Sequence, residues 1–356
     1  DIVALVALFR PGPMQLADDF IRRKHGIEEV DYLHPSLKHV LEGTYGVMLY
    51  QEQVMQIAQI LAGYSLANAD LLRRAMGKKK PEEMAKQREV FLAGTDANNI
   101  DRAQADHIFN LMEKFAGYGF NKPHSVCYAL IAFQTAWLKH YYPADFMASV
   151  LSADMQNTDK VVINVEECKE MNLALLPPDI NQGEFRFVAK DRESIVYGLG
   201  AIKGLGAGPV ENIVKSRGES GSFKDLFDFC GRVDTRKANK KAIEALIGSG
   251  AMDDLVQAAS SHYDEVGYKR ALLLANQEDA IQLADQNTRN ADSGHTDLFG
   301  EVSLMTADMD SDYNHFEDLH CLTLKDRLVK ERTSLGLYLS GHPIDVYRRE
   351  LKYLAK

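Results

Sequence analysis

Apolar residues recur every three or four positions from residue 51 to about residue 172, and this spacing restricts that part of the chain to helices, after a turn-rich entry segment over residues 1–50. Between residues 51 and 76 the apolar positions follow one helical stripe, interrupted at residues 63–65 by Gly-Tyr-Ser. Gly77 stands where a helix would end, and Pro81 marks the next helix, which we expect to reach about Leu92. We expect further helices over residues 101–116, from Pro123 to before Pro143, and over about 143–155 and 158–172.

The second half of the sequence changes character. Residues 181–200 contain alternating apolar and polar positions on both sides of a Lys-Asp-Arg turn, which predicts a β-hairpin. Short helices follow over 201–255, and an amphipathic helix is expected over 261–283. Residues 284–322 combine turn-forming residues with dense acid, which predicts a flexible linker. The chain of 356 residues is therefore expected to be mainly α and multidomain, with one small β-hairpin.

Charge is distributed unevenly along the chain. The formal net charge is −10, and residues 290–324 alone carry eight acids and no lysine or arginine. The rest of the chain is close to neutral, so a basic cluster there can attract a polyanion without a large opposing field.

The composition also argues against several classes of protein. No apolar run reaches the ~18–20 residues that span a bilayer. The four cysteines are scattered without a CxxC or CxxH spacing, so we expect no zinc site, and a cytoplasmic location is predicted. The first residues include neither an initiator Met nor a basic segment, so we interpret this start as a cut through a longer chain.

The strongest basic cluster lies in residues 71–88, which contain seven lysines and arginines. Arg73 and Arg74 would lie near the end of one helix, and Lys78, Lys79 and Lys80 in the following loop, before a helix N-terminus that also attracts anions. Guanidinium groups match phosphate oxygens, so this stretch predicts a polyphosphate or phosphodiester site. The alternative is a solvated helix face whose cations pair with nearby glutamates.

A second candidate site is the loop that precedes the long apolar helix. His124 would lie in the first turn of that helix, next to Asn121 and Lys122, where a donor can meet a phosphate. Gly117 and Gly119 would permit close approach of the backbone, and Tyr118 and Phe120 could stack on a base. The alternative is a capped helix start with both aromatic rings in the core.

Residues 200–217 read as two short helices joined by a glycine hairpin. Gly204 and Gly206 would let backbone N–H groups approach a DNA phosphate, with Lys203 beside them, and Pro209 would begin the second helix. This pattern is typical of the helix-hairpin-helix motif, and an ordinary αα-turn is the alternative. Residues 239–255 form a second, degenerate candidate unit, with charge nearby from Lys237, Lys240 and Lys241.

The acidic stretch contains one short motif. Leu298 and Phe299 are apolar anchors in a polar segment, preceded by Asp297, a pattern suited to docking two side chains into a partner's pocket. The motif resembles the Q-x-[DS]-L-F peptide that bacterial replication proteins insert into the sliding clamp, with His295 in place of the usual Gln. The alternative is a hydrophobic staple onto a neighbouring domain.

Several long motifs, in order along the chain, resemble the bacterial DNA polymerase III α subunits, the C-family replicative DNA polymerases. These are LFRPGPM, TYGVMLYQEQVMQIA, ADLLRRAMGKKKPEEMAKQR, EKFAGYGFNKPHSVCYAL, LPPDIN, YGLGAIKGLGAGPVENI and SLGLYLSGHP.

The resemblance implies a division of the chain. It makes residues 1–180 a helical fingers core, 181–200 a β-hairpin segment, 201–283 a helix-hairpin-helix region, 284–322 a linker with the clamp-binding peptide, and 323–356 the start of a C-terminal region that leads to an OB domain.

The same resemblance implies roles for residues. Nucleotide binding falls to Arg10, Arg73, Arg74, Asn121, Lys122 and His124. DNA binding falls to Lys78, Lys79, Lys80, Lys203, Gly204, Gly206, Lys240 and Lys241. Binding of the β sliding clamp falls to His295, Asp297, Leu298 and Phe299.

The resemblance further implies dNTP, a DNA template-primer and other subunits of the polymerase III holoenzyme as partners. The catalytic aspartates that hold Mg²⁺ belong to a palm domain, and we expect them outside this sequence, so that the fragment alone would not polymerise. Two alternatives stay open: a non-catalytic DNA-binding adaptor that tethers partners to the clamp, and a C-family paralogue used in translesion synthesis.

Overall fold

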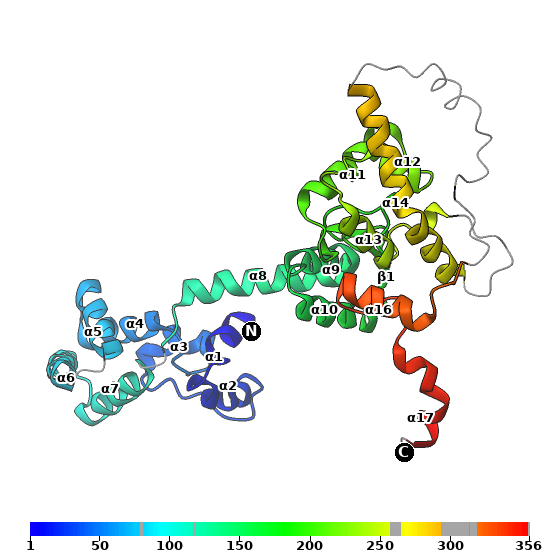
Figure 1. Cartoon of the computed structure of the whole chain (residues 1–356). Coiled ribbons are helices and arrows are strands. Elements are labelled where there is room, and N and C mark those ends of the chain that lie inside the picture. Colours follow the sequence, from blue (N-terminus) through cyan, green and yellow to red (C-terminus); the bar gives the residue numbers. More distant parts are fainter. Residues whose placement is uncertain (79–80, 117–118, 257–264, 293–312, 314–318, 355–356) are drawn as a thin grey trace. The chain divides into compact units, whose positions relative to one another are not determined.

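The computed structural model describes residues 1–78, 81–116, 119–256, 265–292, 313 and 319–354 (Figure 1). It comprises two compact units, residues 1–137 and 138–356, so the first unit ends before the residue 180 expected for the first domain. The prediction of a mainly helical chain with a small β element is confirmed. Across the described ranges, none of the helices is both long and apolar enough to cross a membrane.

Four helices build the main core of the first unit: α4 (Gln51–Ala62), α5 (Leu66–Lys78), α6 (Pro81–Ala97) and α7 (Arg102–Ala116). Helix α4 packs against α5 and α6, and α6 packs against α7. The apolar stripes expected from the sequence face one another, and Ile57, Leu72, Phe91 and Phe109 are fully buried. Burial of such side chains contributes about 1.5–3 kcal/mol each and determines how these helices are placed.

Two of the expected helix ends are wrong. Helix α5 continues through Gly77 to Lys78, so Gly77 does not end the helix. Helix α6 continues past Leu92 to Ala97. Gly94 explains this extension, because a Cβ there would lie 2.3 Å from the carbonyl oxygen of Ala62. The missing side chain lets α6 pass directly over the end of α4, a long-range contact that the local sequence does not reveal.

Short elements precede this core: α1 (Ile2–Leu8), η1 (Pro13–Leu16), α2 (Ala17–Lys24), η2 (Pro35–Leu37), α3 (Lys38–Leu41) and η3 (Glu42–Thr44). They form a second, smaller core in which Leu8 and Phe20 pack with Leu49 and Tyr50. Tyr50 also pairs with Phe120 in an isolated β-bridge, just before α8 (Lys122–Tyr141). The chain start, the residues before α4 and the residues before α8 therefore meet in one place.

The second unit begins with α9 (Pro143–Ala153) and α10 (Thr158–Glu170), followed by a three-stranded sheet. Strands β2 (Val188–Ala189) and β3 (Ser194–Val196) are antiparallel and form the expected hairpin, although it is shorter than its alternating sequence suggests. Strand β1 (Ala174–Leu176) pairs in parallel with β3 and was not predicted, since a three-residue strand has no distinct periodicity.

Helices dominate the rest of this unit: η4 (Leu199–Ala201), α11 (Ala207–Ser220), α12 (Leu226–Arg232), α13 (Lys240–Ser249), η5 (Asp253–Leu255), α14 (Glu265–Asp292), α16 (Leu324–Leu335), η6 (Pro343–Tyr347) and α17 (Arg348–Leu354). Helix α14 packs along α12 and α13, and α16 packs on α13 (Figure 1).

Part of the predicted linker is not a linker. Helix α14 extends to Asp292 rather than ending near residue 283. Tyr313, in the middle of the acidic stretch, is buried in the core of the second unit. Its hydroxyl accepts a hydrogen bond from the backbone N–H of Leu226 at 3.0 Å and donates one to the carbonyl of Leu255 at 3.1 Å. Tyr313 is thus packed into the second unit, although composition alone predicts a flexible linker at this position.

Candidate nucleotide and DNA interface

Two arginines on α5 share one carboxylate. Asp70 Oδ1 accepts hydrogen bonds from Arg73 Nε at 2.9 Å and Nη2 at 2.8 Å. Asp70 Oδ2 lies 2.9 Å from Arg74 Nε. The spacings of three and four residues place all three side chains on one face of the helix. The hydrogen bond from Arg73 holds the pKa of Asp70 below its usual range, so the carboxylate stays ionised and the group keeps one net positive charge.

Gln51, the first residue of α4, connects these arginines to the loop before α8. Its Oε1 accepts a hydrogen bond from Arg73 Nη1 at 3.2 Å, and its Nε2 donates one to the carbonyl of Gly119 at 2.9 Å. Its backbone N–H also donates to the carbonyl of Phe120 at 2.9 Å. A cavity of about 240 Å³ lies here, lined by Gln51, Val54, Arg73, Arg74, Gly77, Phe115 and Gly119.

The start of α8 is held by Glu52. Its carboxylate accepts hydrogen bonds from Asn121 Nδ2 and from the backbone N–H of Lys122, both at 3.0 Å. Asn121 Oδ1 accepts one from the backbone N–H of His124, also at 3.0 Å, and so caps the helix. The Nζ of Lys122 lies 5.6 Å from the centre of the Tyr50 ring. The side chain of Asn121 therefore caps α8, as the alternative of a capped helix start predicts.

Four side chains form a ladder along the chain start, the loop and α8. The guanidinium of Arg10 lies 4.2 Å from the centre of the Phe120 ring. The rings of Phe120 and His124 are 5.3 Å apart, and those of His124 and Tyr128 are 4.4 Å apart. His124 and Tyr128 are exposed, and Phe120 is half-buried rather than in the core. The ladder therefore offers an accessible aromatic surface of the kind on which bases stack.

The predicted nucleotide-binding residues thus gather in the first unit, but not in one cavity. Arg73 and Arg74 line the cavity, whereas His124 does not and is reached through Gly119 and Phe120. Lys78 ends α5, and Lys79, Lys80 and Tyr118 lie outside the described residues.

Sequence reasoning missed the residues that organise this site: Gln51, Glu52, Asp70 and Tyr128. Asp70 could have been found from its spacing to the arginines and Tyr128 from its spacing to His124. The contacts of Gln51 and Glu52 join residues about 70 positions apart and leave no local signal.

The predicted glycine hairpin has the expected form in the second unit. Ile202 and Leu205 are buried, while Lys203, Gly204 and Gly206 are exposed. Gly204 adopts a φ of 85°, which favours glycine, and a Cβ at Gly204 or at Gly206 would have no neighbour within 4 Å. The preceding helix is the 3₁₀ turn η4, which ends at Ala201, and the following helix α11 starts at Ala207 rather than at Pro209. The backbone of this hairpin is open to a phosphate.

In the second candidate unit, residues 239–255, another side chain of the protein covers the glycine turn. Gly250 also adopts a positive φ of 89°, but a Cβ there would lie 2.4 Å from Arg270 Nη2. Lys240 forms an ion pair with Glu278 at 3.1 Å, while Lys241 is exposed. Because a guanidinium fills the turn, this unit does not offer its backbone as the first hairpin does.

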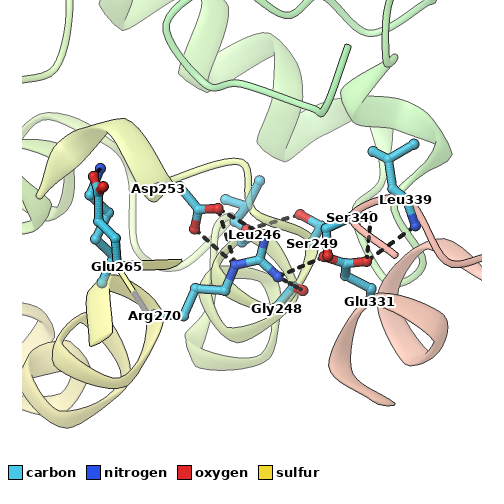
Figure 2. Close-up of polar contacts among 10 residues, drawn as sticks. Leu246, Gly248, Ser249, Asp253, Glu265, Arg270, Glu331, Leu339 and Ser340 are labelled. Atoms are coloured by element: carbon cyan, nitrogen blue, oxygen red, sulfur yellow. Dashed lines mark hydrogen bonds and ion pairs between the residues drawn. The ribbon is translucent and has the colours of Figure 1, made fainter. Parts of the chain in front are cut away.

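Figure 2 shows Arg270 between two carboxylates. Its Nη2 lies 2.8 Å from Asp253 Oδ2, and its Nη1 lies 3.0 Å from Glu331 Oε1. Glu331 also accepts hydrogen bonds from the backbone N–H groups of Leu339 and Ser340, both at 3.1 Å. This buried cluster joins α14, η5 and α16, and the pairing satisfies charges that would be costly to bury alone.

The four residues of the predicted clamp peptide, His295, Asp297, Leu298 and Phe299, lie outside the described residues. Within the described ranges, no group of three or more His, Cys, Asp or Glu side chains could hold a metal ion.

Comparison with known proteins agrees with this geometry. Residues 1–99 match the family model of the bacterial DNA polymerase III alpha subunit finger domain, and residues 172–261 match a helix-hairpin-helix motif. The DNA polymerase III subunit alpha of Pseudomonas aeruginosa is 56% identical over 100% of the chain and 31% of its own length. Those of Vibrio cholerae and Escherichia coli (strain K12) are 54% and 52% identical, over 99% of the chain and 30% of their length.

The chain therefore spans about a third of the length of the curated relatives that it matches. Its finger match covers residues 1–99 of the first unit, which include the arginine pair, and its helix-hairpin-helix match covers the open glycine hairpin. The chain belongs to the family of bacterial DNA polymerase III alpha subunits.

Proposed function

We propose that this chain is the nucleotide-binding and DNA-holding part of a replicative DNA-directed DNA polymerase. One observation supports this above the others: a cationic cavity with Arg73 and Arg74 is joined through Gln51 to an exposed aromatic ladder. A nucleoside triphosphate has the same two parts, an anionic tail and a flat base, so a dNTP suits both ends of the site.

In this proposal the residues of the first unit divide the work of binding. The arginine end neutralises the triphosphate and stabilises the charge that develops on the leaving pyrophosphate. The ladder around His124 stacks against the nascent base pair, and Arg10 extends it toward the template. Lys122 adds positive charge beside the ladder, and Asn121 acts indirectly, by capping α8 and presenting His124. Movement of the finger unit over the bound nucleotide would then exclude water from the reaction.

The metal chemistry of nucleotidyl transfer belongs elsewhere in the longer protein. The described residues do not fit a Mg²⁺ site, because they include no cluster of three potential ligands. We infer that Mg²⁺ is held by carboxylates in the parts of the relatives that this chain does not match, and that the chain by itself does not polymerise.

The open hairpin is proposed to hold duplex DNA by its backbone. Gly204 and Gly206 can present N–H groups to one phosphate, with Lys203 as a point charge beside it. Lys241 could add a weaker contact, whereas Lys240 would first have to leave Glu278. Lys78, Lys79 and Lys80 are proposed to contact the DNA backbone at the finger unit. Such contacts carry no sequence specificity, as a replicative enzyme requires.

The clamp peptide is proposed to act as a tether. Asp297, Leu298 and Phe299, with His295 at the first motif position, would dock into the β sliding clamp and keep the enzyme on DNA. Other subunits of the polymerase III holoenzyme are expected to bind the longer protein. The location that fits this role is the cytoplasm.

A non-catalytic DNA-binding adaptor is the main competing function, since the hairpin and the clamp peptide would suit it equally. The adaptor would have no use for a cationic cavity beside an aromatic surface, which is why we favour the polymerase. A translesion paralogue shares the same site chemistry and would differ in the active-site opening of the full-length protein.

Kinetics of the full-length subunit test the proposal. Arg74→Ala and His124→Ala should each raise the KM for dNTP or lower kcat by about tenfold or more, as expected from losing a hydrogen bond to a charged group or a stacking contact. Single-nucleotide extension of a primer-template measures both constants. Arg102→Ala is the matched control, because Arg102 is exposed and pairs only with Asp96 in the described chain. Unchanged constants in both site variants would remove the nucleotide assignment.

A further inference from the structure

The two arginines of the cavity are held very differently. Arg73 uses Nε and Nη2 on Asp70 and Nη1 on Gln51, and its side chain is 31% exposed. Arg74 is paired within the described chain only through Nε, to the other oxygen of Asp70, and its side chain is 63% exposed. Its two terminal nitrogens carry four N–H donors. Arg74 is therefore accessible to an incoming anion, whereas the guanidinium of Arg73 is already hydrogen-bonded to Asp70 and Gln51.

The bridge through Gln51 depends on its carboxamide. One atom of this group must accept a hydrogen bond from Arg73 while another donates to the carbonyl of Gly119. A carboxamide does both at once, whereas a carboxylate only accepts and an aliphatic side chain does neither. The approach is close, since a Cβ on Gly119 would lie 3.1 Å from Gln51 Cγ. The carboxamide of Gln51 is thus suited to fix the position of Arg73 on α5 relative to the loop before α8.

We propose that Arg73 is a positioning residue and that Arg74 provides the anion contact of the site. Asp70 and Gln51 fix Arg73 so that it ties α5 to the loop before α8, and Asp70 at the same time aims the fork of Arg74 into the cavity. Gln51 is then the link that holds Arg73 on α5 against the loop that carries Phe120 and His124. This proposal rests on the nucleotide-binding function proposed above.

Steady-state kinetics of the full-length subunit distinguish the two roles. Arg74→Ala should raise the KM for dNTP by about tenfold or more, and Arg74→Lys should restore part of it, because a point charge still attracts phosphate. Arg73→Ala and Gln51→Leu should mainly lower kcat, because the bound nucleotide is no longer aligned. Arg73→Lys should not restore kcat, since an ammonium group cannot reproduce the planar guanidinium held by Asp70 and Gln51.

A double-mutant cycle provides the decisive measurement. Gln51→Leu combined with Arg73→Ala should be no worse than the more severe single variant, because both remove the same link. Gln51→Leu combined with Arg74→Ala should show the product of the two separate effects. Gln56→Leu, at an exposed position on the same helix α4, is the matched control and should leave both constants unchanged.

Thermal unfolding of each variant shows whether it is folded. If Gln51→Leu does not fold, Gln51→Glu replaces it: this variant keeps an acceptor for Arg73 and loses the donor to Gly119, and should lower kcat with little change in KM.

Two outcomes would overturn the division of roles. One is an equal rise in the KM for dNTP in Arg73→Ala and Arg74→Ala, with Lys rescuing both. The other is independent, multiplicative effects of Gln51→Leu and Arg73→Ala. Both outcomes leave nucleotide binding itself intact. Failure of the proposed function looks different, because Arg74→Ala and His124→Ala would then both leave the kinetics for dNTP unchanged.

Discussion

At the scale of single residues, Arg270 shows how this chain deals with buried charge. Its side chain is 4% exposed and that of Glu331 is 1% exposed, yet every charged end of the cluster has a partner. Asp253 and Glu331 lie in segments about 80 residues apart, so one guanidinium connects the turn after α13 to α16. Such a cluster adds little net stability when complete, but it makes the loss of one member expensive.

We expect Arg270→Met to lower the free energy of unfolding by about 3–5 kcal/mol, because two carboxylates would stay buried without a counter-charge. Urea titration followed by circular dichroism measures the change. Lys240→Met is the control, since its exposed pair with Glu278 should contribute only about 0–1 kcal/mol. Similar losses in the two variants would mean that the buried cluster has no special energetic role.

At the scale of elements, two glycine turns of the second unit have the same backbone geometry and opposite surroundings. Gly204 and Gly250 both have positive φ, but the first turn is open and the second is filled by Arg270. A turn can present its N–H groups to DNA only when nothing of the protein covers it. In the proposed function, therefore, only the turn at Gly204 contacts DNA, whereas the turn at Gly250 has a structural role.

Substitutions at the two turns should separate these roles. Gly206→Ala should weaken binding of duplex DNA without lowering the unfolding temperature, because a Cβ there would have no protein neighbour within 4 Å and would stand between backbone and phosphate. Gly250→Ala should instead lower stability by at least about 1–2 kcal/mol, through left-handed strain and contact with Arg270. Fluorescence anisotropy with a labelled duplex and thermal unfolding give the two readouts. A stable Gly206→Ala protein with unchanged DNA affinity would contradict the assignment.

At the scale of the whole molecule, acidic and basic residues are concentrated in different parts of the sequence. The segment of residues 290–324 contains eight of the acids and no lysine or arginine, whereas the arginine pair and the glycine hairpin are basic or neutral. An acidic stretch is repelled by DNA, so a motif within it is suited to a protein partner. Among the described residues of this segment, Tyr313 is hydrogen-bonded to the backbone of Leu226 and Leu255 in the second unit.

We expect Leu298→Ala combined with Phe299→Ala to abolish binding of the full-length subunit to the sliding clamp, because both apolar anchors of the peptide are lost. Surface plasmon resonance with immobilised clamp measures the affinity. Thr296→Ala is the control and should bind nearly as well, because Thr296 occupies the unspecified second position of the motif. Retained affinity in the double variant would show that the peptide is misinterpreted.

The sequence alone was sufficient for much of the fold and of the family. Helical stripes, the left-handed Gly63 and the prolines at 81 and 143 predict most helices of the first 172 residues, because periodicity and caps act within a few positions. Local sequence also revealed the positive charge of Arg73 and Arg74, the place of His124 in the first turn of α8 and the hairpin at Gly204. The helix limits at Gly77 and Leu92 were wrong, and at Leu92 the reason is the close packing of α6 on α4 at Gly94.

Only the tertiary structure decided what these residues do together. The bridge from Arg73 through Gln51 to Gly119, the support of α8 by Glu52, the closure of Gly250 by Arg270 and the burial of Tyr313 all join distant positions. Sequence patterns report the period of one element and the chemistry of its side chains. The partner that a polar side chain finds is set by how separate elements pack, because hydrogen bonds and ion pairs form only where packing brings both groups within about 3 Å.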